Sequence, residues 1–262
     1  MRTESEREKA TQEFHQMSDY YDKYRPDYPE EIIRTIINKA NLAASSKLLE
    51  IGSGSGKATA QFADFGFEIV CIEPGVDLVE QGKAKFKDNK NIKFVASRFE
   101  DYSAPPEYFD AIISAQAFHW VSQPLGYEKC AKTLKKGGYL APFWYIDLSR
   151  DVDLDRELIS ICHKYDGFVS IMPEENYDKR MESITSKIVS SGLFSNPEII
   201  HSFLEKNYTA DEYFNLLLTA SNFVEQPEKA KQACREELTR LADKYNGIKR
   251  RYTYELYLTQ KL

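Results

Sequence analysis

The stretch KLLEIGSGSGK occupies residues 47–57. It begins with an apolar run, Leu48, Leu49 and Ile51, which is typical of a strand buried on both faces. Three glycines at alternate positions follow: Gly52, Gly54 and Gly56. Glycines remove side chains where the backbone must bend sharply and where a ligand approaches closely. The stretch therefore predicts a buried strand that runs into a tight, ligand-binding turn.

The spacing of the glycines argues against a dinucleotide site. In the fingerprint G-x-G-x-x-G the third glycine would fall at position 57, where this chain has Lys57. Glu50, at the end of the predicted strand, can accept hydrogen bonds from an amine or hold the loop through backbone N–H groups. From this motif alone, a purely structural glycine turn in another α/β protein remains the alternative.

Strands and helices alternate from residue 47 to residue 146, which is typical of a mostly parallel sheet with helices on both faces. The expected strands are 47–51, 67–72, 92–96, 108–114, 139–145, 198–208 and 248–258. The expected helices are 2–23, 30–40, 58–65, 76–86, 125–134, 183–191, 209–220 and 228–245. Ligands of such sheets bind beyond the carboxyl ends of the strands, and Glu50, Glu73, Ser97 and Ser114 all fall at that edge.

The position of Glu73 suggests a contact with a ribose. It follows Glu50 by 23 residues and ends the second predicted strand, where open α/β nucleotide sites place a carboxylate that accepts from ribose hydroxyls. A solvated loop acid is the alternative.

With these motifs the chain resembles the class I S-adenosylmethionine (SAM)-dependent methyltransferases. Two further segments strengthen the resemblance. Residues 20–29 are similar to the Y-x-x-Y-R-P-x-Y-P entry of a small-molecule subset, and residues 117–120 match the A-x-H-W segment of trans-aconitate methyltransferase-like proteins. The resemblance implies a Rossmann-like class I methyltransferase fold, with a seven-stranded, mostly parallel sheet, helices on both faces and a helical cap insertion. It also implies SAM as cofactor and S-adenosylhomocysteine as product.

The resemblance assigns candidate site residues. Those expected to bind the cofactor are Tyr24, Arg25, Glu50, Gly52, Ser53, Gly54, Gly56, Glu73, Pro74, Arg98, Phe99, Glu100, Ser114, Ala115, Gln116 and His119. Candidate substrate residues are Tyr20, Trp120, Trp144 and Tyr145. In these relatives an acid in the loop after the third strand commonly bonds the exocyclic amine of adenine, but this chain has Arg98 at that position. Adenine could then be bound by Glu100, by Asp101 or only by backbone groups near Phe99.

His119 is the candidate catalytic residue. The unperturbed pKa of histidine lies near neutrality, so the side chain could act as a general base or orient the nucleophile. A structural histidine is the alternative. If the acceptor is a carboxylate, Arg25 would orient it.

The resemblance divides the chain into residues 1–146 with lid helices and SAM-binding core, a cap and substrate insertion at 147–195, and residues 196–262, which complete the sheet of a single domain. The segment 216–221 looks like the L-x-x-T-x-S stretch that lines substrate pockets in the same relatives. Substrate selectivity is expected in the insertion.

Composition excludes several other classes. The net charge of −6 argues against a nucleic-acid partner, because binding to phosphates requires a basic surface. Four widely spaced cysteines predict reduced thiols in a cytoplasmic protein. We expect no metal site, since no cluster with ligand spacing is visible, and no membrane span, since no apolar run of about 18 residues occurs. The oligomeric state, monomer or homodimer, is left open.

The sequence thus predicts a SAM-dependent methyltransferase that acts on an oxygen, nitrogen or carboxylate of a small molecule. Two alternatives remain: a protein that binds SAM or S-adenosylhomocysteine without transfer, and an NAD-dependent oxidoreductase, which Lys57 disfavours.

Overall fold

The structure is a computed structural model, and it describes residues 23–149, 152–167 and 171–262. The helix expected at residues 2–23 and the substrate candidate Tyr20 lie outside this described part, except for Lys23.

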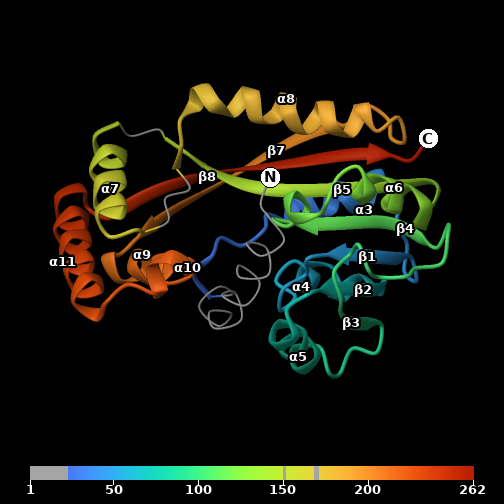
Figure 1. Cartoon of the computed structure of the whole chain (residues 1–262), viewed down its shortest axis with the longest axis horizontal. Coiled ribbons are helices and arrows are strands. Elements are labelled where there is room, and N and C mark those ends of the chain that lie inside the picture. Colours follow the sequence, from blue (N-terminus) through green and yellow to red (C-terminus); the bar gives the residue numbers. More distant parts are fainter. Residues whose placement is uncertain (1–22, 150–151, 168–170) are drawn as a thin grey trace. The chain divides into compact units, whose positions relative to one another are not determined.

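The elements follow the alternation that the sequence predicts (Figure 1). In chain order they are α3 Glu30–Lys39, β1 Lys47–Ile51, α4 Thr59–Phe62, η1 Ala63–Phe65, β2 Glu68–Glu73, α5 Val76–Lys85, β3 Ile92–Ala96, β4 Phe109–Ala115, η2 Phe118–Trp120, α6 Leu125–Thr133, β5 Leu134–Leu148, α7 Val152–Lys164, β6 Ile171–Met172, α8 Glu174–Ser190, β7 Glu198–Tyr208, α9 Ala210–Leu217, α10 Ser221–Val224, α11 Glu228–Tyr245 and β8 Ile248–Gln260.

The strands form one sheet in the order β3-β2-β1-β4-β5-β8-β7. Strand β1 pairs in parallel with both β2 and β4, so Glu50 lies between Cys71 and Ile113. Figure 1 shows β8 running in the direction opposite to β4. All seven predicted strands form, and the sheet is mostly parallel, as expected. The two-residue β6, which pairs with β5, is an eighth strand that the sequence did not predict.

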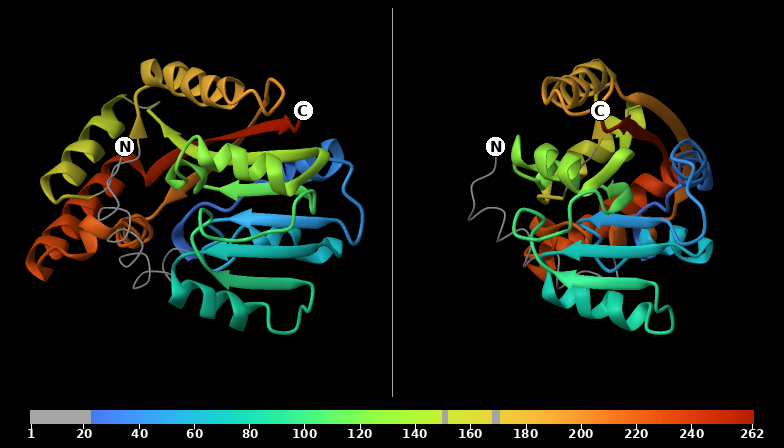
Figure 2. Two further views of the ribbon diagram at one scale, coloured as in Figure 1. Left: turned by 45° about the vertical axis from the view of Figure 1, so that its right-hand side comes forward. Right: turned by 90° about the vertical axis from the view of Figure 1, so that its right-hand side faces the viewer.

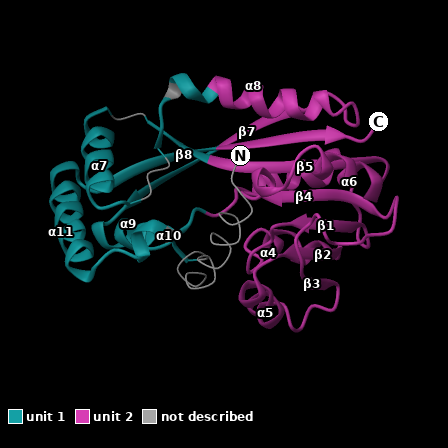
Figure 3. Ribbon diagram, viewed as in Figure 1, with its two compact units in different colours: residues 1–26, 146–177, 203–253 teal, residues 27–145, 178–202, 254–262 magenta. Residues whose placement is uncertain are grey.

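The chain divides into two compact units (Figure 3). One unit comprises residues 1–26, 146–177 and 203–253, and the other comprises residues 27–145, 178–202 and 254–262. Strands β5, β7 and β8 each have residues in both. We call the second unit the sheet unit, because it contains the whole of β1, β2, β3 and β4, and we call the first the helical unit.

Helices cover both faces of the sheet in the sheet unit. Helix α3 turns Ile32, Ile33 and Ile36 inward, where each is at most 1% exposed, and its first turn carries two acids that suit the helix dipole. Figure 2 shows α3 and α6 on opposite faces of the sheet. Because β1 is covered on both sides, its apolar run is buried, which keeps the following turn at a fixed edge.

The helical unit contains a buried ion cluster. The guanidinium of Arg250, which is 4% exposed, pairs with the carboxylates of Asp147 and Asp155, which are 3% and 1% exposed. In the same unit Thr209 and Glu212 form a capping box at the start of α9.

Several element boundaries differ from the predictions. The helix expected at 58–65 is a short α4 followed by a 3-10 turn that ends at Gly66, whose φ is 78°. The helix expected at 183–191 begins at Glu174. Strand β5 begins at Leu134, five residues before the predicted start, with a shift in its register against β4 between Phe109 and Ala111. This irregular start lacks the alternation that identifies a strand in sequence.

Candidate active site

The glycine turn after β1 is stabilised by backbone hydrogen bonds. The N–H of Gly52 donates to the carbonyl of Ile72 at 2.8 Å, and the N–H of Gly56 donates to that of Ser53 at 2.9 Å. Gly54 has a φ of 57°, and a Cβ added there would meet no atom within 4 Å. The backbone at Gly54 therefore borders open space, as a loop that receives a ligand requires.

Glu73 connects the end of β2 to this turn. Its carboxylate accepts from the N–H of Gly54 at 3.0 Å and from the N–H of Gly75 at 2.8 Å. The side chain is 8% exposed. The two bonds fix the carboxylate at the end of β2, directly beside the backbone of the glycine turn.

Glu50 is buried beneath the turn. It is 1% exposed, and its carboxylate accepts from the hydroxyl of Thr59 at 2.5 Å. Burial raises the pKa of Glu50, the hydrogen bond from Thr59 lowers it, and the negative charge of Glu73 raises it, so that together the pKa moves from its ordinary 4.5 to about 7. Glu50 thus titrates near neutrality. The sequence reasoning missed Thr59, although a hydroxyl one helical turn past the glycines was a usable signal.

The segment after β4 packs tightly against the glycine turn. A Cβ added at Gly52 would lie 2.3 Å from the Cβ of Ala117, so only glycine fits there. Between β4 and this segment, Gln116 has a φ of 59°, a backbone conformation that residues other than glycine rarely adopt. The N–H of Gln116 donates to the carbonyl of Phe143 at 2.9 Å, which holds the bend. Such strained backbone persists only where the surroundings fix it, and it clusters at functional sites.

The side chain of Ser114 has a structural contact at the same edge. Its hydroxyl is fully buried and donates to the carbonyl of Ile51 at 2.9 Å, which links the ends of β1 and β4. The sequence expected Ser114 among the cofactor-binding residues, and the structure brings its backbone to the predicted edge with the hydroxyl already bonded.

The loop after β3 contains the candidates for reading adenine. Phe99 is 3% exposed, whereas Asp101 is exposed. Glu100 accepts from the N–H of Ser122 at 2.8 Å. Although burial alone would raise the pKa of Glu100, this bond and the nearby Arg98 lower it, so the carboxylate is ionised and anchors the segment that follows Trp120.

His119 and Trp144 meet beyond the end of β4. The indole N–H of Trp144 donates to Nδ1 of His119 at 3.1 Å. His119 is exposed, whereas Trp144 is only 5% exposed. The ring of Trp120 lies 5.2 Å from that of His119 between centroids. The histidine is therefore bonded to a buried aromatic side chain and remains accessible from solvent.

The two substrate candidates on β5 face opposite sides of the sheet, since successive side chains of a strand alternate. The ring of Tyr145 packs 5.8 Å from that of Tyr254, and the ring of Phe143 packs on Tyr28. Only Trp144 therefore lies on the side of His119.

Tyr24 and Arg25 belong to the helical unit. There Nε of Arg25 donates to the hydroxyl of Thr219 at 2.7 Å. Thr219 is fully buried and lies in the segment 216–221 that the sequence analysis singled out as pocket-lining. The guanidinium of Arg25 is thus held by a motif far away in sequence, a contact that no local pattern indicates.

Of the other expected residues, Ser53 and Ala115 are buried and Pro74 is exposed, each beside a strand end of the same edge. Within residues 23–149, 152–167 and 171–262 no group of three or more His, Cys, Asp or Glu side chains is arranged to hold a metal ion. In the same part of the chain, no helix combines the length and the apolar character needed to cross a membrane.

Comparisons with known proteins find similar chains. Residues 49–141 match the family described as "Methyltransferase domain". CRG1 of Saccharomyces cerevisiae, named as a probable S-adenosylmethionine-dependent methyltransferase, is 30% identical over 152 residues, which are 56% of this chain and 51% of that protein. The chain thus spans about half the length of the curated relatives that it matches first.

Two solved structures share the fold. A provisionally assigned type II methyltransferase from Anaeromyxobacter dehalogenans has a TM-score of 0.63 and 21% identity, over 90% of this chain and 97% of that one. Haemonchus contortus phosphoethanolamine N-methyltransferase 2, in complex with phosphomonomethylethanolamine and S-adenosylhomocysteine, has a TM-score of 0.50 and 13% identity, over 87% and 52%. With the sheet order and the glycine turn, these matches show that residues 49–141 are similar to the methyltransferase domain family and that the chain has the Rossmann-like fold of class I methyltransferases.

Proposed function

We propose that the protein is a SAM-dependent methyltransferase that methylates a small molecule. The observation that carries the proposal is the junction of two segments: the glycine turn, open at Gly54 and bonded to Glu73, packs through Gly52 on the segment that presents His119. A cofactor on the turn would therefore lie next to an accessible histidine. The methyltransferase domain match and the named relatives support the same activity.

The residues at the edge fit the proposed cofactor. The open space at Gly54 admits a ligand close to the backbone, and Glu50 supplies a buried acid below the turn. We assign Glu73 to the ribose hydroxyls because it lies at the carboxyl end of β2, where open α/β nucleotide sites place a carboxylate. Residues Arg98, Phe99 and Glu100 form the loop that we assign to adenine. Bound there, S-adenosylmethionine supplies a methyl group on a positively charged sulfur.

For such a transfer the protein has to align the acceptor and exclude water. Well-oriented intramolecular reactions gain on the order of 7 to 11 kcal/mol from positioning alone. Trp120 and Trp144 border His119 with large rigid surfaces, and we propose that they position an acceptor beside it. Because the sheet unit supplies all these side chains, this arrangement uses groups of that unit alone.

Lys57 argues against the NAD-dependent alternative. It stands where a dinucleotide site needs its third glycine, and Nζ pairs with the carboxylate of Asp27 at 2.7 Å with the lysine side chain 11% exposed. That lysine is thus part of the packing around the turn.

The proposal is tested by binding and by transfer. We expect calorimetry to give S-adenosylhomocysteine binding and no NADH binding. Incubation with methyl-labelled SAM and a library of small carboxylates, amines and phenols should then label at least one acceptor. Binding without any labelled product would favour the SAM-binding protein without transfer, and NADH binding in place of S-adenosylhomocysteine would favour the oxidoreductase.

A further inference from the structure

The hydrogen bond between Trp144 and His119 determines where the imidazole proton resides. An indole N–H can only donate, so the nitrogen that it contacts must present a lone pair. Since Trp144 donates to Nδ1 at 3.1 Å, that nitrogen carries no proton. A neutral imidazole then has its proton on Nε2.

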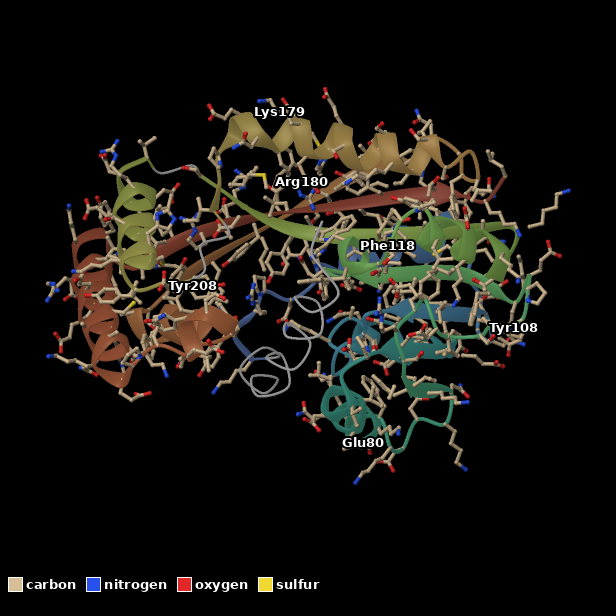
Figure 4. The ribbon with its side chains drawn as sticks, viewed as in Figure 1. Glu80, Tyr108, Phe118, Lys179, Arg180 and Tyr208 are labelled. Carbon is tan, nitrogen blue, oxygen red and sulfur yellow. The ribbon has the colours of Figure 1, made fainter. Side chains whose placement is uncertain are left out.

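Trp144 is held in this orientation by its neighbours. The guanidinium of Arg180 stacks on the indole, 5.3 Å from the ring centroid, and the ring of Tyr257 meets it edge-on at 5.8 Å. Figure 4 shows Arg180 pointing from α8 toward the sheet, whereas Lys179 points away. Packed between these groups, the 5%-exposed indole has little freedom to turn its N–H elsewhere.

The charges of this cluster are balanced. Arg180 pairs with Glu255, whose side chain is fully buried, and Tyr257 donates to the same carboxylate at 3.3 Å. Burial raises the pKa of Tyr257, so its hydroxyl stays neutral. The groups around Trp144, namely Arg180, Glu255 and Tyr257, therefore supply no net negative charge that would favour a protonated His119.

We infer that Trp144 is a positioning residue that keeps His119 in the Nε2–H tautomer, so that His119 serves as a hydrogen-bond donor and not as the general base. This inference rests on the proposed function. For His119 to take a proton, Nε2 would first have to lose the proton that it carries, or the indole N–H of Trp144 would have to stop donating to Nδ1.

The inference restricts the acceptor. Its atom must carry an available lone pair at neutral pH, and the group that contacts His119 must accept a hydrogen bond. In the transfer, that lone pair forms the new bond to the methyl carbon, and the electron pair of the broken carbon–sulfur bond stays on sulfur. No proton passes to His119.

The tautomer is measured directly by ¹⁵N NMR of the full-length protein with labelled histidine, with His119→Gln used to assign the signal. We expect a neutral Nε2–H imidazole at pH 7, and a larger share of the other tautomer or of the imidazolium in Trp144→Phe, which keeps an aromatic ring but removes the N–H. An Nδ1–H tautomer or an imidazolium in the wild type would overturn the inference. This measurement needs neither cofactor nor acceptor, so its failure is distinct from failure of the proposed function.

Transfer kinetics give a second test. Glutamine at position 119 retains an N–H donor near Nε2 but takes no proton at neutral pH. We expect His119→Gln to keep activity within about tenfold of the wild type, while His119→Ala loses more. If His119 were a general base, both variants would lose roughly 100-fold or more, and equal losses would overturn the inference. His201→Gln, at an exposed histidine of β7, is the matched control.

Discussion

The carboxylate of Glu73 accepts from the N–H of Gly54 at 3.0 Å, and this bond attaches the glycine turn to the end of β2. We predict that Glu73→Ala lowers the affinity for S-adenosylhomocysteine by at least about tenfold, because a charge-assisted hydrogen bond contributes about 1.5–3 kcal/mol and the turn also loses its anchor. Isothermal calorimetry measures the effect. Glu68→Gln, at the exposed opposite end of β2, should bind as the wild type does. Unchanged affinity in Glu73→Ala would contradict the assignment of Glu73 to the cofactor site.

Gly54 and Gly192 form a matched pair for testing the turn. Both have positive φ, 57° and 66°, and a Cβ at either would meet nothing within 4 Å. An arginine at either position should therefore cost a similar amount of stability, about 1–2 kcal/mol for the left-handed backbone. We predict that only Gly54→Arg abolishes cofactor binding, since its side chain enters the space above the turn. Equal binding by the two variants in calorimetry would contradict the assigned site.

Glu50 should make stability depend on pH. Its pKa is about 7 in the folded protein and near 4.5 when exposed, so between these values the folded state holds a proton that the unfolded state has lost. Stability from this group is present below about pH 4.5 and declines as the pH rises through 7. We predict that Glu50→Gln gains stability relative to the wild type between pH 5 and pH 8, as measured by chemical denaturation.

The control for Glu50 is Glu80→Gln, at an exposed acid paired with Lys83. This variant also removes one negative charge, but it leaves the buried acid in place. If the difference in free energy of unfolding between the wild type and Glu50→Gln stayed constant with pH, Glu50 would not titrate between pH 5 and pH 8.

Arg250 should be essential for the stability of the helical unit. Replacing it with methionine leaves Asp147 and Asp155 as uncompensated buried acids, which typically costs 3–5 kcal/mol. Arg251→Met is the control, because Arg251 pairs with a largely exposed Glu205 at 3.7 Å and such surface pairs contribute about 0–1 kcal/mol. Thermal or urea unfolding measures the stability of the two variants. Similar losses of stability in Arg250→Met and Arg251→Met would contradict a stabilising role for the buried cluster.

The sequence predicted the sheet well because its strands carry local signals. Strand β3 and helix α11 begin and end at the predicted residues, 92–96 and 228–245, and the edge that carries Glu50 and Glu73 follows from parallel pairing alone. Strand β5 was predicted too short because its first residues combine lysines and glycines that resemble a helix stop. The two-residue β6 has no periodicity to detect.

The candidate site could be located from the sequence but not described in detail. Gly54 and Glu73 were expected at one edge, and the structure brings them together. The bonds from Thr59 to Glu50, from Trp144 to His119 and from Arg25 to Thr219 are side-chain contacts, the last between residues 194 positions apart. Such contacts depend on how elements pack in three dimensions, which no spacing in the sequence specifies. The cofactor-binding and substrate assignments as a whole remain predictions.

The close fit of Gly52 against Ala117 has a consequence for protein engineering. Since a Cβ at Gly52 would lie 2.3 Å from the Cβ of Ala117, we expect a library that enlarges residue 117 to shift the glycine turn as well, and so to lower affinity for the proposed methyl donor together with that for the acceptor. Redesign should instead begin at Trp144, whose indole N–H contacts His119 from β5.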